Sequence, residues 1–320
     1  MRIMIVGAGS LGLLFAAKLS AVCEQIIVVT RTIEQAVTLK ERGIFVLDET
    51  TTERNKSMGL DIQYNSYIED SRNPMFDMQA NEVCLDYVFL MVKQPAITSE
   101  MITYVKSRMS STTVLICIQN GVGHEERLSE AIGKNRLLLA VTTEGARKER
   151  ANEVFHTGQG VTYMGSLTQN DGPAWSTQIL LRDLLKEAGF ETIMSKDMKV
   201  RIWSKLIMNA VINPLTAILR VRNGELVNSP WAQLLMRQLY EEALLVAKAK
   251  DVELPAELWE TLLQVCRATE QNHSSMLQDL MQARGTEIDS MNGSLLRMAE
   301  ELKLELAVNK IVYHFVKALE

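Results

Sequence analysis

The feature that most constrains this chain is the glycine-rich turn GAGSLG at residues 7–12. It follows an apolar, strand-like run at 2–6, opens a helical pattern at 10–20, and is followed by a β-branched run at 26–30. This order is the βαβ unit in which G-x-G-x-x-G spacing binds a dinucleotide. The first glycine permits a tight turn, the second lets backbone approach the pyrophosphate, and the third lets helix and strand pack closely. The predicted phosphate-binding residues are Gly7, Ala8, Gly9, Ser10, Leu11 and Gly12.

Strand and helix patterns alternate over residues 1–195, which predicts a Rossmann-type, doubly wound α/β sheet domain. Further strands are expected at 84–92, 112–118 and 136–143, and further helices at 33–42 and 174–188. The polar segment 48–82 has little periodicity and is expected to be irregular, with one or two edge strands.

The pattern changes at residue 196, where strand signals almost vanish. Apolar residues then recur on the helical period, which predicts an all-α C-terminal domain over 196–320. The expected helices cover residues 197–219, 231–250, 255–282, 293–303 and 308–318.

Composition excludes several function classes. A net charge of −5 argues against binding nucleic-acid phosphates as the main task. The four cysteines lack C-x-x-C spacing, so we expect neither a disulfide framework nor a metal site, and a reducing cytoplasm fits.

No uninterrupted apolar run reaches about 18 residues, so no membrane span is predicted. The N-terminal stretch is similar to a signal peptide, but Lys18 and the spaced glycines favour a folded strand and helix.

Three positions after predicted strands bear on the cofactor. Arg31 stands after VVT, where NAD-binding domains usually carry an acid, and a guanidinium suits the 2′-phosphate of NADP. Lys93 and Asn120 also follow strands, where a cofactor would pass. The alternatives are a solvated loop lysine at Lys93 and an ordinary Asn-Gly turn at Asn120.

A polar stripe marks the first predicted helix of the second domain. Lys205, Asn209 and Asn213 recur every four residues and therefore share one helical face. Pro214 is expected to end or kink this helix.

Further polar residues lie at the other end of the domain. Asn272 and Ser275 are expected on one face of a later helix, and Glu287 in an irregular or helix-starting segment. Each residue alone is readily structural, as a cap or a backbone partner. Together, an ammonium, several amides and hydroxyls, and a carboxylate fit the reduction of a 2-oxo acid.

These residues resemble the 2-dehydropantoate 2-reductase (ketopantoate reductase) family over the whole chain. The resemblance rests on VGAGSLG, Arg31, VK at 92–93, QNG at 119–121, TTEGAR at 142–147, WSKLIMNAVINPLTAI at 203–218, NGEL at 223–226, NHSSMLQDL at 272–280 and TEIDSMNG at 286–293. It implies reduction of 2-dehydropantoate to (R)-pantoate with NADPH, in a site between a Rossmann domain and a helical domain.

The resemblance also implies residue roles. Lys205 corresponds to the general acid, and Glu287 to the acid that touches the cofactor and orients the site. Ala146 and Lys93 match cofactor-lining positions, while Asn120 lies near both nicotinamide and substrate. The implied substrate-binding residues include Asn209, Asn213, Asn223 and Ser275.

Two alternatives stay open on the sequence alone. One is an NADPH-dependent reductase of another branched 2-oxo acid, which a substrate panel would distinguish. The other is a non-catalytic, dinucleotide-sensing regulator, which would bind NADPH without oxidising it. Oligomeric state is also open, with a homodimer as one alternative.

Overall fold

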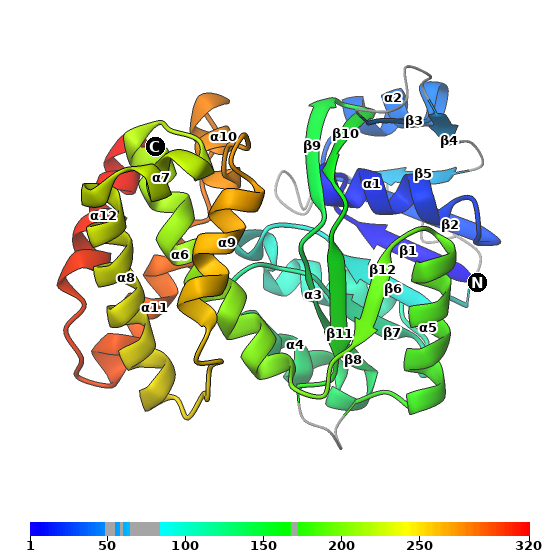
Figure 1. Ribbon diagram of the computed structural model, residues 1–320. Helices are drawn as coiled ribbons and strands as arrows, with labels where there is room; N and C mark the ends of the chain where they lie inside the picture. Colours follow the sequence, from blue (N-terminus) through cyan, green and yellow to red (C-terminus); the bar gives the residue numbers. More distant parts are fainter. Residues whose placement is uncertain (49–54, 58–59, 65–83, 168–171) are drawn as a thin grey trace. The chain divides into compact units, whose positions relative to one another are not determined.

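The computed structural model describes residues 1–48, 55–57, 60–64, 84–167 and 172–320. These residues form two compact units (Figure 1). The first consists of Met1–Gln119 and His124–Met198, and the second of Asn120–Gly123 and Lys199–Glu320. Much of the segment 48–82 lies outside the described residues, but two short strands fall within it.

An eight-stranded sheet forms the centre of the first unit. Its strands are β1 (Arg2–Val6), β2 (Gln25–Thr30), β5 (Leu60–Tyr64), β6 (Tyr87–Leu90), β7 (Val114–Cys117), β8 (Leu137–Thr142), β11 (Val161–Gly165) and β12 (Glu191–Met194). They lie in the order β12-β11-β8-β7-β6-β1-β2-β5, and every neighbouring pair is parallel except β8 and β11. The order reverses between β1 and β6, which is the switch point where such sheets bind ligands. The predicted doubly wound sheet is confirmed.

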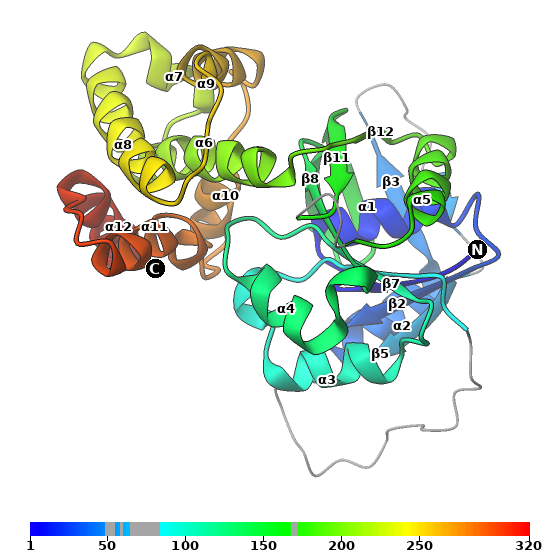
Figure 2. The ribbon, with the colours of Figure 1, turned by 90° about the horizontal axis from the view of Figure 1, so that it is seen from below.

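Helices cover both faces of this sheet (Figure 2). The helices are α1 (Ser10–Leu19), α2 (Ile33–Arg42), α3 (Ser99–Ser107), α4 (His124–Ile132) and α5 (Trp175–Glu187). Alternate strand residues such as Ile3 and Ile5 pack with α1 and α5 in one core, where the rings of Phe15 and Phe190 stack 4.1 Å apart. The other face carries α3 and α4. The N-terminal stretch thus forms a buried strand and helix of this core.

A smaller, four-stranded sheet packs against α1. It contains β3 (Ile44–Leu47), β4 (Asn55–Ser57), β9 (Gly145–Arg150) and β10 (Glu153–Gly158), in the order β4-β3-β10-β9. The sequence did not predict this sheet, because its two local pairs, β3 with β4 and β9 with β10, are joined by the pairing of β3 with β10, whose residues lie about a hundred positions apart. It brings β9 alongside the glycine-rich turn.

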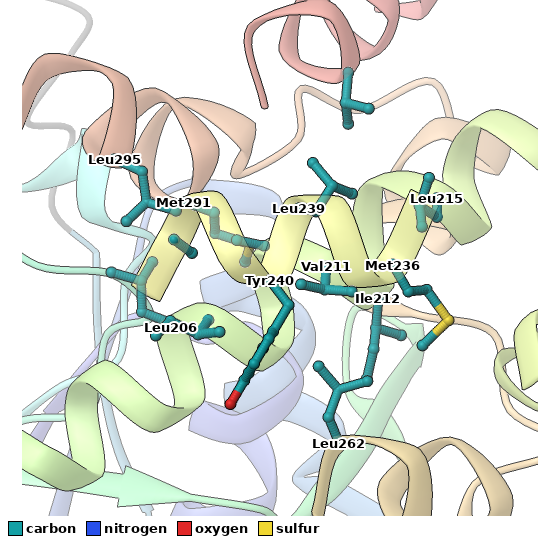
Figure 3. Close-up of a cluster of buried hydrophobic side chains, with 14 of the residues drawn as sticks. Leu206, Val211, Ile212, Leu215, Met236, Leu239, Tyr240, Leu262, Met291 and Leu295 are labelled. Carbon is teal, nitrogen blue, oxygen red and sulfur yellow. The ribbon is translucent and has the colours of Figure 1, made fainter. Parts of the chain in front are cut away.

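The second unit is helical, as predicted. It contains α6 (Met198–Leu219), α7 (Asn223–Asn228), α8 (Pro230–Ala249), α9 (Leu258–Ala268), α10 (Ser275–Met281), α11 (Asn292–Glu301) and α12 (Ala307–Leu319). Its core joins Val211 and Ile212 of α6 to Leu239 of α8 and Leu262 of α9 (Figure 3). Of the described helices, α6 alone is long and apolar enough to cross a membrane, but 61% of its apolar window is buried inside the protein. Such burial is typical of a core helix.

The predicted single helix at 255–282 is wrong. The chain forms α9 and α10, separated by a turn that contains Asn272. Ser274 begins α10 because its Oγ accepts a hydrogen bond from the N–H of Leu277 at 3.1 Å. Asn272 therefore lies outside the helix and does not share a helical face with Ser275.

Pro214 does not end α6, which continues through it to Leu219. A proline inside a helix leaves the carbonyl four residues earlier without its usual donor. That carbonyl belongs to Ala210, and Nδ2 of Asn292 donates to it at 2.9 Å. The same nitrogen donates to Oδ1 of Asn309 at 3.0 Å. Asn292 is fully buried, so this contact replaces the missing backbone bond in the core.

Asn292→Ala is expected to lower the free energy of unfolding by about 2–3 kcal/mol, because it leaves two buried acceptors unpaired. Chemical denaturation of the whole protein measures this change. Asn228→Ala, at an exposed asparagine in the same unit, should stay within about 0.5 kcal/mol of the parent. Equal stability of the two variants would show that α6 does not depend on Asn292.

Candidate active site

The three glycines of the turn differ in what surrounds them. Gly7 has a φ of +110°, and a Cβ there would meet Cγ1 of Val92 at 2.9 Å. A Cβ on Gly12 would meet the carbonyl oxygen of Gly7 at 1.9 Å. A Cβ on Gly9 would meet no described atom within 4 Å. The first and third glycines thus satisfy the protein's own packing, whereas Gly9 leaves an open approach to the N-terminus of α1, as a dinucleotide requires.

A lysine that sequence reasoning missed stands beside this turn. Nζ of Lys148, on β9, donates to the carbonyl of Ala8 at 3.3 Å, and its backbone N–H donates to Oγ of Ser10 at 3.1 Å. Lys148 is two residues beyond Ala146, so both side chains lie on one face of the strand. That alternation was the available signal. Ala146 itself is half-buried and packs against the core of the first unit.

The carboxyl end of β2 presents Arg31 to solvent. The buried hydroxyl of Thr30 donates to the carbonyl of Thr32 at 3.0 Å, and Thr32 caps α2 by accepting from the N–H of Gln35. Glu34 lies in the first turn of α2, where a carboxylate is favoured by the helix dipole. The exposed charge at the strand end is therefore the guanidinium of Arg31.

The loop after β6 is fixed by Gln119, whose Nε2 donates to the carbonyls of Leu90 at 2.6 Å and Val92 at 3.1 Å. Lys93 follows at an exposed position before a short 3₁₀ turn, Gln94–Ala96. The strand β6 ends at Leu90, so Lys93 lies in the loop beyond the strand and not directly after it.

One polar cluster of the second unit contains Lys205, Glu287 and Asn120. Nδ2 of Asn120 donates to Oε2 of Glu287 at 3.2 Å. Glu287 is buried and opens the 3₁₀ turn Ile288–Ser290. Burial lowers the pKa of Lys205 to about 8, while the charge of Glu287 acts to raise it. Asn120 also precedes Gly121, whose φ is +84°, so the Asn-Gly turn and the side-chain contact coexist.

The rest of the stripe connects α6 to the start of α10. Asn209 is half-buried, whereas Asn213 is buried with Nδ2 3.7 Å from Sδ of Met291. The hydroxyl of Thr216 lies 2.9 Å from the carbonyl of Asn213 and 2.7 Å from Oγ of Ser274. The face that carries Lys205 is thereby joined to the segment before Ser275.

Asn223 completes this region from α7. Its backbone N–H donates to the carbonyl of Asn272 at 3.0 Å, and its Nδ2 donates to Oγ1 of Thr269 at 2.9 Å. The side chains of Asn272 and Ser275 are exposed. The structure therefore places Asn223 beside the 272–275 segment, with which only the family resemblance had grouped it. No group of three or more potential metal ligands occurs among the described residues.

Comparison with known proteins matches both halves of the chain to one family. The model "Ketopantoate reductase PanE/ApbA" covers residues 3–169, and "Ketopantoate reductase PanE/ApbA C terminal" covers 197–320. A 2-dehydropantoate 2-reductase from Archaeoglobus fulgidus is 32% identical, over 100% of this chain and 98% of the relative. The one from Bacillus subtilis is 31% identical, with the same coverage.

Solved structures share the fold. The crystal structure of a probable 2-dehydropantoate 2-reductase from Bacillus subtilis superposes with a TM-score of 0.79 at 29% identity, over 100% of both chains. A D-mandelate dehydrogenase structure with NADH and anilino(oxo)acetate gives a TM-score of 0.85 at 23% identity, over 100% of this chain and 98% of that one. At this identity the second similarity speaks to the fold alone.

Proposed function

Since this chain belongs to the ketopantoate reductase family, we propose that it reduces 2-dehydropantoate to (R)-pantoate with NADPH. The observation that carries the proposal is the cluster in which Lys205, with its lowered pKa, stands beside the buried carboxylate of Glu287, which accepts from Asn120. Relatives at 31–32% identity over the full chain carry the name 2-dehydropantoate 2-reductase. In our proposal residues 1–195 bind NADP and residues 196–320 bind substrate.

We assign the cofactor phosphates to the turn Gly7–Gly12, including the N–H groups at the start of α1. The open approach at Gly9 fits a dinucleotide. Arg31 would bind the 2′-phosphate, while Lys93 and Ala146 would line the remainder of the cofactor site. When bound, NADPH supplies the hydride that adds to the C2 carbonyl carbon.

The second unit would bind the oxo acid and deliver the proton. Asn209, Asn213, Asn223, Asn272 and Ser275 hold its carboxylate and hydroxyl through uncharged groups. As the C2 oxygen gains negative charge, Nζ of Lys205 transfers its proton to that oxygen, leaving a neutral amine and pantoate. Glu287 holds Lys205 electrostatically and orients Asn120 near the reacting carbonyl.

A substrate panel tests the function. Purified protein should consume NADPH with 2-dehydropantoate at a higher kcat/KM than with 3-methyl-2-oxobutanoate or other branched 2-oxo acids. A higher kcat/KM for one of those acids would support the alternative reductase, since small differences between apolar groups are hard to read from a site. Tight NADPH binding without oxidation by any oxo acid would support the alternative that the protein is a non-catalytic, dinucleotide-sensing regulator.

Arg31→Ala is expected to raise the KM for NADPH by about 10- to 100-fold, because it removes a charge-assisted contact with the 2′-phosphate. The KM for NADH, which lacks that phosphate, should stay nearly unchanged. Arg42→Ala, at an exposed arginine at the end of α2, serves as the control. Equal losses with NADPH and NADH would contradict this assignment.

We also propose that the protein forms a homodimer through its helical unit. Large apolar side chains remain exposed on α8, including Trp231 at 78%, and on α12, including Ile311 at 56% and Phe315 at 57%. Exposed apolar faces of this kind are typical of interaction surfaces. A ketopantoate reductase from Staphylococcus aureus is described as dimeric. Sedimentation velocity should show a dimer that Trp231→Glu weakens, whereas a monomer at all concentrations would contradict the proposal.

A cytoplasmic location is our proposal as well. All four cysteines carry free thiols, and Cys117 and Cys266 are buried. Such thiols suit a reducing compartment. Cell fractionation with an antibody to the native protein tests this location.

A further inference from the structure

The amide of Asn223 has one paired end and one unpaired end. Its Nδ2 donates to Thr269, but its Oδ1 has no hydrogen-bond partner among the described residues. Asn223 is only 9% exposed, so bulk water does not readily reach this oxygen. A buried carbonyl left without a donor is costly, and this cost favours any hydroxyl or N–H group that enters the site and reaches it.

Thr269 determines which end of the amide is paired. Its hydroxyl donates to the carbonyl of Val265 at 2.7 Å, so its single proton is already used. Its oxygen can then only accept, and the atom 2.9 Å away must be the N–H donor of Asn223. The reverse orientation of the amide would set two acceptors against each other. Thr269 thus fixes Oδ1 of Asn223 as the unpaired end.

We propose that Thr269 is a positioning residue that makes Asn223 an acceptor for the substrate's hydroxyl group. The inference rests on the proposed function, in which Asn223 belongs to the substrate site. Its backbone N–H already donates to Asn272 at the start of the 272–275 segment. The hydroxyl of 2-dehydropantoate is a donor, whereas its carboxylate and ketone only accept. An acceptor at this position therefore selects the hydroxylated acid over its deoxy analogue.

The test compares kcat/KM for 2-dehydropantoate and for 3,3-dimethyl-2-oxobutanoate, which lacks only the hydroxyl. The parent should prefer the hydroxylated acid by at least about 100-fold, since a buried acceptor is left unpaired by the analogue. Thr269→Val should reduce that ratio by roughly 10-fold, because the amide loses the acceptor that fixes its orientation and its oxygen is no longer held towards the substrate hydroxyl. Thr269→Ser, which keeps the hydroxyl, should restore the ratio.

A matched control lies about two helical turns earlier in the chain. Thr261 of α9 makes the same bond to the carbonyl four residues earlier, that of Glu257, at 2.9 Å. In both positions the backbone N–H of the threonine donates to that carbonyl as well, so valine leaves it paired. Thr261→Val should keep the substrate ratio of the parent. A purely structural role for Thr269 would lower kcat/KM for both acids equally and would overturn the inference.

Coupling to Asn223 gives a second readout. In an Asn223→Ala background, Thr269→Val should no longer change the substrate ratio, because both substitutions act on one amide. An undiminished effect in that background would overturn the inference. If the parent reduces neither acid, the proposed function fails, and the inference is then decided by calorimetric binding of pantoate and its 4-deoxy analogue. A preference for pantoate that Thr269→Val abolishes would support it, and equal binding would overturn it.

Discussion

Lys205→Ala is expected to lower turnover of 2-dehydropantoate by about 10²- to 10⁴-fold, the usual effect of losing one positioned proton donor. The pKa of about 8 makes Lys205 a better donor near neutral pH than an ordinary lysine, while most of it remains protonated. The ammonium is needed only once charge develops on the substrate oxygen. Consequently kcat should fall far more than binding of the oxo acid, and steady-state kinetics with NADPH measures both.

Two comparisons separate this role from a structural one. Lys248→Ala, at an exposed lysine of α8, should leave kcat unchanged, and the thermal unfolding temperature of Lys205→Ala should remain close to that of the parent. Near-full turnover by Lys205→Ala would overturn the assignment. A parallel loss of stability and turnover would show that α6, and not the proton donor, had been damaged.

The pH profile gives an independent prediction. The protonated amine is the active form, so turnover should be highest below about pH 8 and fall as pH rises through the pKa of Lys205. Because the charge of Glu287 raises that pKa, Glu287→Gln should move the fall to lower pH. A decline that stays at the same pH in Glu287→Gln would contradict the coupling between these groups.

The parts of the fold that depend on local chemistry could be predicted from the sequence. The glycine turn between β1 and α1 depends on neighbouring residues, and the helical period exposed the stripe of Lys205 and Asn209. The resemblance to the ketopantoate reductase family, also read from the sequence, is confirmed by full-length relatives. The break between α9 and α10 was missed because a serine can cap a helix or lie within one, and only the bond from the N–H of Leu277 shows that Ser274 is a cap.

Contacts between residues far apart in the sequence limit how much of the site can be predicted from the sequence. Asn120 and Glu287 are 167 positions apart, and no spacing rule relates them. Asn292 was not recognised because its role is to satisfy the carbonyl that Pro214 leaves without a donor. Local propensity predicts a break at Pro214. The hydrogen bond from the distant Asn292 satisfies the carbonyl that the proline leaves without a donor, so the helix continues. Thr269 was missed for a similar reason, since only the folded chain shows which proton it uses.

Gly12→Ala is expected to disrupt the turn itself, lowering the free energy of unfolding by about 3 kcal/mol and abolishing dinucleotide binding. The added Cβ would lie 1.9 Å from the carbonyl oxygen of Gly7, and a backbone atom cannot move aside as the end of a flexible side chain can. Helix α1 would have to shift away from the turn. Chemical denaturation and NADPH fluorescence titration measure the two effects.

Gly9→Ala is the matched substitution, because its Cβ meets no described atom within 4 Å. Stability should therefore change little, while the added methyl group blocks the approach of the pyrophosphate and weakens NADPH binding by on the order of 10-fold or more. Gly12→Ala and Gly9→Ala together distinguish the packing of the turn from the approach of the ligand to it. If Gly9→Ala bound NADPH as tightly as the parent, the open side of the turn would not be the phosphate site, and the assignment of residues 7–12 to the cofactor would fail.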